Sequence, residues 1–199
     1  MSSLRFVVSV VTALAFLPGA PFPSAAIEAQ PTAEQIRAAL DRGKEASRQQ
    51  SPPDTFYVRF GSTDDLHPGG FLITKLGSLS VMATHMALRG YEPSPADIAQ
   101  VMEAPTMLVS TVILGNTPSF AVDSYMVFEQ GGKTIKPVTV RFDGQANRSA
   151  AWPDPPRFKA KVVASFNYVD FDPTAKTTLT VFPAPGGDVS FSLDFSQIK

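Results

Sequence analysis

Apolar and polar residues alternate strictly in two segments near the C-terminus. In residues 158–168 the apolar row is Phe158, Ala160, Val162, Ala164, Phe166 and Tyr168. In residues 189–195 the apolar row is Val189, Phe191, Leu193 and Phe195. A period of two sends successive side chains to opposite faces of a strand, so each segment is expected to be half-buried. Strands with one dry and one wet face are typical of antiparallel sheets.

Shorter segments carry weaker strand patterns. We expect strands at 55–60, 71–73, 107–114, 122–128, 138–142 and 177–182. Residues 107–114 are apolar on nearly every position, as in a central strand. Gly131-Gly132 predicts a hairpin turn. Ile135 is out of phase with the row Val138, Val140 and Phe142, so a bulge is expected near Pro137.

Three segments show helical spacing instead. The first follows Thr32, a capping residue with Gln35 three positions later, and extends to about residue 50. The second covers residues 76–89 and ends before Gly90, and the third begins at Ser94-Pro95 and extends to about residue 103. The whole pattern predicts a mainly β, α+β fold: an antiparallel β-sandwich of immunoglobulin-like size with an N-terminal helix and two inserted helices.

The first residues have the features of a targeting segment. Arg5 is followed by twelve apolar or small residues, 6–17, and then by Pro18 and Gly19. Twelve residues are too few to span a hydrocarbon core, which needs about 20. We therefore expect a signal peptide, residues 1–26, cleaved after Ala26; the alternative is an uncleaved anchor. The remaining chain divides into a helical segment, 27–54, and a sandwich domain, 55–199, with the helical insertion at about 76–103.

Charge and residue composition exclude several classes of partner and site. The 199 residues carry 17 Lys and Arg against 18 Asp and Glu, a net charge of −1, so no nucleic-acid partner is expected. No second stretch is long and apolar enough to be a transmembrane segment of the mature chain. The chain has no cysteine, which excludes disulfides, thiolate metal sites and lipid attachment at cysteine. These features favour a secreted or periplasmic protein of a bacterial envelope. The sequence predicts no cofactor.

One loop gathers residues that could perform chemistry. Asp64, Asp65 and His67 lie together between Gly61 and Gly69. Two carboxylates and an imidazole could bind a metal or transfer protons. The competing interpretation is a turn in which the Asp side chains bond to their own backbone. His85 lies in the second predicted helix and would have to be brought to the loop by folding.

The single tryptophan is the candidate for recognition of a partner. Trp152 lies in a loop rich in proline, residues 144–156. Exposed aromatic rings on such loops can dock proteins or sugars. The alternative is that Trp152 folds back over the edge of a sheet. No nucleophile elbow, phosphate loop or dinucleotide fingerprint is present.

The leader, the helix sequence EQIRAALDRGK at 34–44 and the closing strand FSLDFS at 191–196 resemble uncharacterised secreted proteins of environmental bacteria. The resemblance spans most of the mature chain. It implies an N-terminal helix followed by a β-sandwich. It implies no activity, so no residue role is transferred from it.

Three functions fit the sequence. The first is an exported, non-enzymatic binding or structural module, with an envelope protein or a glycan as its partner. The second is a metal-dependent or acid–base hydrolase that uses Asp64, Asp65 and His67. The third is a subunit whose helix at 32–50 docks on a partner through an exposed apolar patch.

Overall fold

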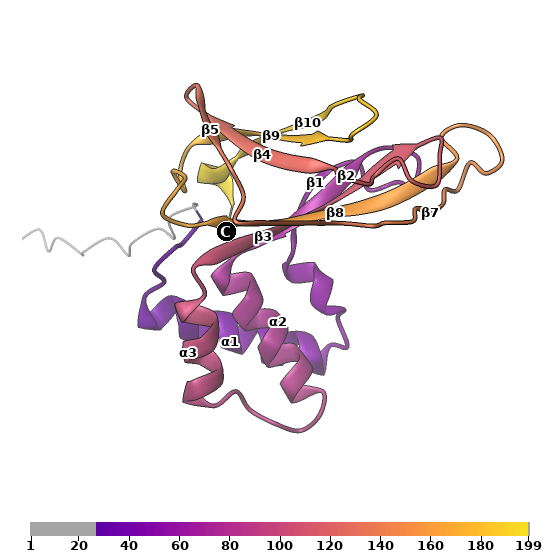
Figure 1. Cartoon of the computed structure of the whole chain (residues 1–199). Helices are drawn as coiled ribbons and strands as arrows, with labels where there is room; N and C mark the ends of the chain where they lie inside the picture. The colour runs from indigo at the N-terminus through magenta and orange to yellow at the C-terminus, as the bar shows by residue number, and fades with distance from the viewer. Residues whose placement is uncertain (1–26, 199) are drawn as a thin grey trace, which may run out of the picture.

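The computed structural model describes residues 27–198, which form two antiparallel sheets and a group of three α-helices (Figure 1). The larger sheet, sheet A, has the order β1-β2-β3-β8-β6, and β7 pairs with β8 beside β6. Its strands are β1 (Val58–Gly61), β2 (Gly69–Ile73), β3 (Thr106–Gly115), β6 (Thr139–Phe142), β7 (Asn147–Arg148) and β8 (Phe158–Asn167).

The smaller sheet, sheet B, covers one face of sheet A. Its order is β10-β9-β4-β5. Its strands are β4 (Tyr125–Gln130), β5 (Lys133–Ile135), β9 (Lys176–Phe182) and β10 (Val189–Asp194), followed by the 3-10 turn η2 (Phe195–Gln197). Each strand pair in both sheets is antiparallel. The predicted fold class, an α+β protein built on an antiparallel sandwich, is confirmed.

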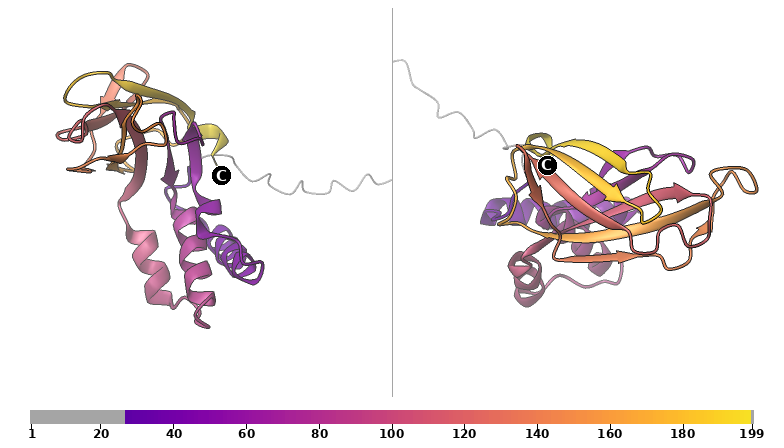
Figure 2. Two further views of the ribbon diagram at one scale, coloured as in Figure 1. Left: turned by 90° about the vertical axis from the view of Figure 1, so that its right-hand side faces the viewer. Right: turned by 45° about the horizontal axis from the view of Figure 1, so that its top comes forward.

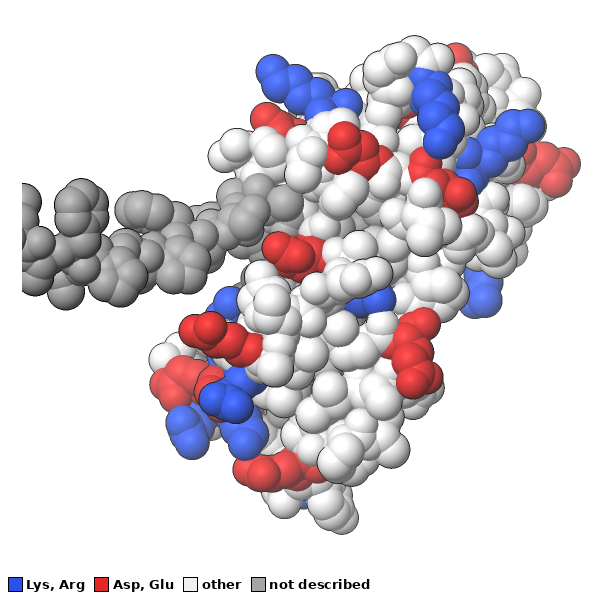
Figure 3. Space-filling model, turned by 90° about the vertical axis from the view of Figure 1, so that its left-hand side faces the viewer, with Lys and Arg blue, Asp and Glu red and all other residues white. Residues whose placement is uncertain are grey.

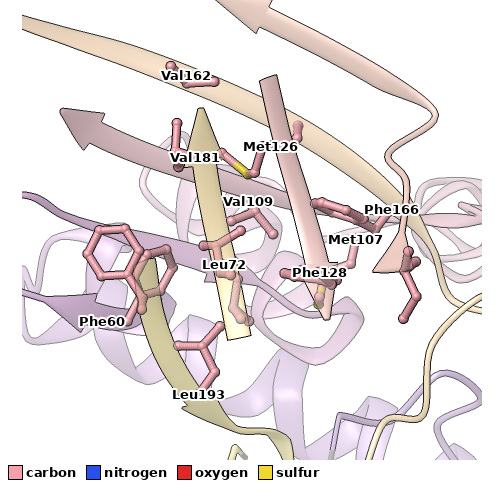
Figure 4. Packing of buried hydrophobic residues seen from close by; sticks show 14 of the residues in the cluster. Phe60, Leu72, Met107, Val109, Met126, Phe128, Val162, Phe166, Val181 and Leu193 are labelled. Atoms are coloured by element: carbon pink, nitrogen blue, oxygen red, sulfur yellow. The ribbon is translucent and has the colours of Figure 1, made fainter. Parts of the chain in front are cut away.

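The inner faces of the two sheets form the main core (Figure 4). Phe128 of sheet B stacks on Phe166 of sheet A with ring centroids 3.8 Å apart. The rings of Phe171 and Phe195 meet Phe128 edge-on, at 5.9 Å and 5.5 Å. Four phenylalanines therefore join both sheets at one end, while Phe60 and Phe191 make a similar edge contact at 5.0 Å elsewhere.

The alternating segments become the strands that their pattern predicted. In β8 the buried residues are Ala160, Val162, Ala164 and Phe166, and in β10 they are Phe191 and Leu193. β3 lies between β2 and β8, with sheet B on one face and the helices on the other, which explains why its sequence is nearly all apolar. The hairpin at Gly131 and Gly132 forms with φ of 53° and 82°, values that glycine adopts readily.

Two strand predictions need correction. Residues 53–56 form a 3-10 turn, η1 (Pro53–Phe56), because Thr55 and Tyr57 donate backbone bonds to Pro52 and Asp54; the strand begins only at Val58. Residues 119–124 form turns, so β4 begins at Tyr125. In both places local backbone hydrogen bonds compete with the sheet.

The predicted bulge near Pro137 is instead a passage between sheets. Ile135 pairs with Phe128 in sheet B and is buried, whereas the Val138 N–H donates to Ser165 in sheet A at 2.7 Å. The break in the apolar alternation between Ile135 and Val138 is therefore the point where the chain passes from sheet B to sheet A. Val138, just before β6, is 55% exposed, and Phe142, at the end of this edge strand, is 37% exposed.

The helices lie together next to sheet A, on the side away from sheet B (Figure 1 and Figure 2). They are α1 (Ala33–Arg48), α2 (Lys75–Ala87) and α3 (Pro95–Glu103). The predicted capping box is present: Thr32 Oγ1 accepts from the Gln35 N–H, and Gln35 Oε1 accepts from the Thr32 N–H. Within residues 27–198 no helix has the length and apolar character needed to span a bilayer. The predicted signal peptide, 1–26, lies outside the described residues.

Small residues let α1 and α2 cross closely. Ala39 and Gly43 of α1 face Ser80 and Thr84 of α2. The Ser80 hydroxyl donates to the Ala39 carbonyl at 2.9 Å, and the Thr84 hydroxyl donates to the Gly43 carbonyl at 3.0 Å. This contact orients α2, whose first turn contributes to the pocket described below.

Candidate functional site

The loop that holds Asp64 and His67 is an exposed turn with its own hydrogen bonds. Asp64 accepts from the Ser62 hydroxyl at 2.7 Å and from the Leu66 N–H at 2.8 Å. Nδ1 of His67 lies 2.8 Å and 2.9 Å from the two carboxylate oxygens of Asp64. These are the contacts expected of an Asp side chain that organises its own turn.

The electrostatics of Asp64 agree with this arrangement. The Ser62 hydroxyl, then His67, then the Leu66 N–H lower the pKa of Asp64 to about 2. A carboxylate with so low a pKa is ionised at neutral pH and is a weak base. The loop does bring Asp64 and His67 together, and the Asp64 carboxylate also accepts from the Ser62 hydroxyl and the Leu66 N–H.

Asp65 and His85 lie apart from that contact. Asp65 accepts from Lys159 Nζ of β8 at 3.0 Å, and His85 is exposed on α2. The described residues contain no group of three or more His, Cys, Asp or Glu that could hold a metal ion. The arrangement therefore supplies a salt bridge and a turn, and it offers no metal centre in residues 27–198.

Trp152 lies in a loop that is held in one shape. The Ser149 hydroxyl donates to the Pro156 carbonyl and accepts from the Ala151 N–H at 3.1 Å. Arg157 Nε donates to the Pro153 carbonyl at 3.0 Å. Several backbone bonds close the same loop, so its tip has little freedom despite its length.

Trp152 is 41% exposed, and its indole rests on two neighbours. The Arg148 guanidinium lies 4.6 Å from the ring centroid, a cation–π contact. Phe158 meets the indole edge-on at 5.3 Å. Trp152 therefore packs at the end of β8 and remains partly exposed to solvent.

A third site lies between the helices and the outer face of sheet A, and we name it the α2–α3 pocket. Its volume is about 390 Å³. Its apolar lining residues are Ile73, Met82, Val101, Ala104 and Leu108, and its polar lining residues are Lys75, Ser78, Asp97, Gln100, Thr106 and Tyr168. Pockets of about 300–1,000 Å³ with mostly apolar walls and a few polar groups are typical of small-molecule sites.

Lys75 is the first residue of α2 and the cation of this pocket. Its Nζ donates to the Met102 carbonyl at the end of α3, at 2.5 Å, and lies 5.2 Å from the centroid of the Tyr168 ring. Lys75 forms no salt bridge within the described part of the chain. Partial burial lowers its pKa from the ordinary value.

Tyr168 forms the floor beside Lys75. It follows β8 and is held there by its N–H, which donates to the Pro105 carbonyl at 3.0 Å. Burial raises the pKa of the Tyr168 phenol, and a backbone hydrogen bond from Lys75 opposes that shift only in part. The phenol is therefore neutral at physiological pH.

Sequence reasoning did not find the α2–α3 pocket. Lys75 and Tyr168 are distant in sequence, and neither stands in a recognisable motif. One signal was present: Leu108 lies on the outer row of a strand whose inner row is buried, and an apolar outer row indicates that something covers it.

Charged side chains form no large field of one sign on the face shown in Figure 3. Basic and acidic groups are interspersed there, and uncharged atoms cover most of the surface. The exposed residues of α1 are Ala33, Glu34, Arg37, Ala38, Asp41, Arg42, Glu45 and Arg48. This surface has only two alanines among its charged groups, so it lacks the apolar patch that docking through α1 requires.

Comparison with known proteins identifies no family. No family model matches the chain, and no curated protein matches it. Among solved structures, the archaellum periplasmic stator protein FlaG from Sulfolobus acidocaldarius is similar over 46% of this chain and 88% of its own, with 12% identity and a TM-score of 0.32. The FlaF and FlaG complex from the same organism is similar over 45% and 78%, with 15% identity and a TM-score of 0.27. Scores this low carry no argument about function.

Proposed function

We propose that this chain is an exported, non-enzymatic binding module of a bacterial envelope and that its ligand occupies the α2–α3 pocket. One observation carries the proposal: a pocket of about 390 Å³ joins an apolar wall to a lysine that has no carboxylate partner in residues 27–198. Export rests on the leader pattern of residues 1–26.

Binding accounts for this geometry better than catalysis does. The polar groups that line the pocket include no histidine and only one carboxylate, Asp97. Asp97 is occupied by the N–H and hydroxyl of Ser94, at 2.8 Å and 2.6 Å. The hydrolase alternative uses Asp64, Asp65 and His67, which lie in an exposed turn: Asp64 accepts from the Ser62 hydroxyl and the Leu66 N–H, and Asp65 pairs with Lys159.

The loop around Trp152 supports a second candidate, recognition of a glycan or an envelope protein. The supporting observation is that Trp152 is 41% exposed on a loop that several hydrogen bonds hold together. A fixed aromatic surface can stack on a sugar ring or bury itself in a partner with little loss of entropy.

A fragment screen by NMR tests the proposed function. Fragments added to the purified exported chain are expected to shift the amide signals of Lys75, Val101 and Leu108. The variant Ala104→Leu fills the pocket and should abolish these shifts, whereas Ala38→Leu, on the exposed face of α1, should keep them. Shifts that centre on residues 148–158 instead would favour the second candidate, and an unchanged response in Ala104→Leu would refute the pocket.

A further inference from the structure

We propose that the ligand of the α2–α3 pocket is an amphipathic monocarboxylate: its carboxylate binds the Lys75 ammonium and its hydrocarbon chain lies against Val101 and Leu108. This inference rests on the proposed function and adds the chemical class of the ligand. The observation behind it is one cation with an unfilled hydrogen-bonding capacity beside an apolar wall.

The Lys75 ammonium has donors to spare. An ammonium carries three N–H donors. One of them reaches the Met102 carbonyl, and the Tyr168 ring lies on another side at 5.2 Å. Both contacts are with neutral groups, so the charge has no counterion among the described residues. A ligand carboxylate would supply that counterion and accept a charge-assisted hydrogen bond.

The other charged group of the pocket does not compensate Lys75. Asp97 lies in the first turn of α3, whereas Lys75 contacts Met102 near the end of the same helix. Five residues of helix separate the two positions by about 7.5 Å along the axis. Both polar hydrogens of Ser94 point to one oxygen of Asp97 and lower its pKa, which keeps this carboxylate ionised in its cap.

Tyr168 favours an anion in the same place. A phenolate beside Lys75 would neutralise the lysine and repel a carboxylate. Burial raises the pKa of the Tyr168 phenol, so the ring remains neutral. Its π face attracts the ammonium without cancelling its charge.

The walls away from Lys75 suit a hydrocarbon chain. The apolar groups are contributed by α2, α3 and the outer row of sheet A: Ile73, Met82, Val101, Ala104 and Leu108. Leu108 is 38% exposed, so a hydrocarbon chain that covers it would remove apolar surface from water, which is favourable. A volume of about 390 Å³ equals that of about 13 waters at about 30 Å³ each, enough for a medium-length chain.

The test compares ligands that share a tail and differ in the head. Octanoate, octanol and octyltrimethylammonium are titrated below their micellar concentrations, with calorimetry and amide shifts as readouts. Octanoate should bind about 10- to 100-fold more tightly than octanol, the range expected for a hydrogen bond between charged groups. Octyltrimethylammonium should bind more weakly than octanol.

Variants then assign the head to Lys75. Lys75→Met should lower octanoate affinity to the level of octanol, and Lys75→Arg should retain most of it. The control Lys176→Met, at the exposed first residue of β9, should change nothing. Lys75→Met also loses the hydrogen bond to the Met102 carbonyl, which could disturb the pocket. Unchanged binding of octanol by this variant shows that the pocket still forms.

The outcomes separate the two proposals. Equal affinity for octanoate and octanol, with no effect of Lys75→Met, overturns the carboxylate inference and leaves the pocket as a ligand site. Loss of both ligands in Ala104→Leu, with preference for octanoate in the unmodified chain, confirms both. Failure of every amphiphile to perturb residues that line the pocket overturns the carboxylate inference, whereas the absence of any fragment response at Lys75, Val101 and Leu108 overturns the proposed function.

Discussion

The crossing of α1 and α2 predicts an unusual response to the substitution Gly43→Ala. In an exposed helix this change is stabilising by about 1 kcal/mol, because alanine is the better helix former. At Gly43 an added Cβ would lie 2.3 Å from the Ser80 carbonyl oxygen and 2.7 Å from the Ala83 Cβ. The first neighbour is helix backbone, so the contact can be relieved only by moving the helices apart.

The magnitude follows from the contacts that this movement disturbs. Overpacking of a tight contact costs about 1–3 kcal/mol. The hydrogen bonds from Ser80 and Thr84 across the crossing, at 2.9 Å and 3.0 Å, would lengthen, at about 1 kcal/mol each. After the gain of about 1 kcal/mol in helix propensity, we expect Gly43→Ala to lower the free energy of unfolding by about 2–4 kcal/mol, or the melting temperature by about 5–15 °C.

Thermal and denaturant unfolding of three variants measures this. Gly144→Ala makes the same chemical change where no atom lies within 4 Å of the added Cβ, and it should alter stability by less than about 0.5 kcal/mol. Ala38→Gly, on the exposed face of α1, reports the propensity contribution alone, about 1 kcal/mol of destabilisation. A Gly43→Ala protein more stable than the parent would refute the close crossing.

Three further predictions concern other parts of the molecule. Phe128→Ala should destabilise by about 3–5 kcal/mol in denaturant unfolding because it removes the ring that joins the two sheets, whereas Phe142→Ala, at the exposed edge, should cost far less; similar costs would contradict the assigned core. The pKa of Asp64 is about 2, below its ordinary value, so the stability it contributes is present above about pH 4 and is lost as pH falls towards 2; an NMR titration midpoint near 4 would contradict the turn contacts. Arg148→Ala should expose the only tryptophan, Trp152, and increase acrylamide quenching of its fluorescence; unchanged quenching would show that the guanidinium does not cover the indole.

Periodicity predicted much of the sandwich. The strict alternation of residues 158–168 and 189–195 placed their buried rows correctly, since burial against a second sheet requires a period of two. Thr32 and Ser94 marked two helix starts because capping is a local interaction.

Tertiary contacts could not be predicted in the same way. The pattern around Ile135 and Val138 predicts one strand with a bulge, because the sequence does not show that residues three positions apart belong to different sheets. The pocket was missed because Lys75, Met102 and Tyr168 meet only after α2 and α3 fold against sheet A. The two carboxylates and the imidazole of the Asp64 loop are residue types that can perform chemistry. In the structure, however, Asp64 contacts its sequence neighbours Ser62, Leu66 and His67.

A crystal structure of the chain with octanoate would locate the ligand and its carboxylate. We expect ligand density in the α2–α3 pocket, a carboxylate oxygen about 2.8 Å from Lys75 Nζ, and an alkyl chain against Val101 and Leu108. Density for octanoate at another site, with this pocket holding only water, would contradict this expectation.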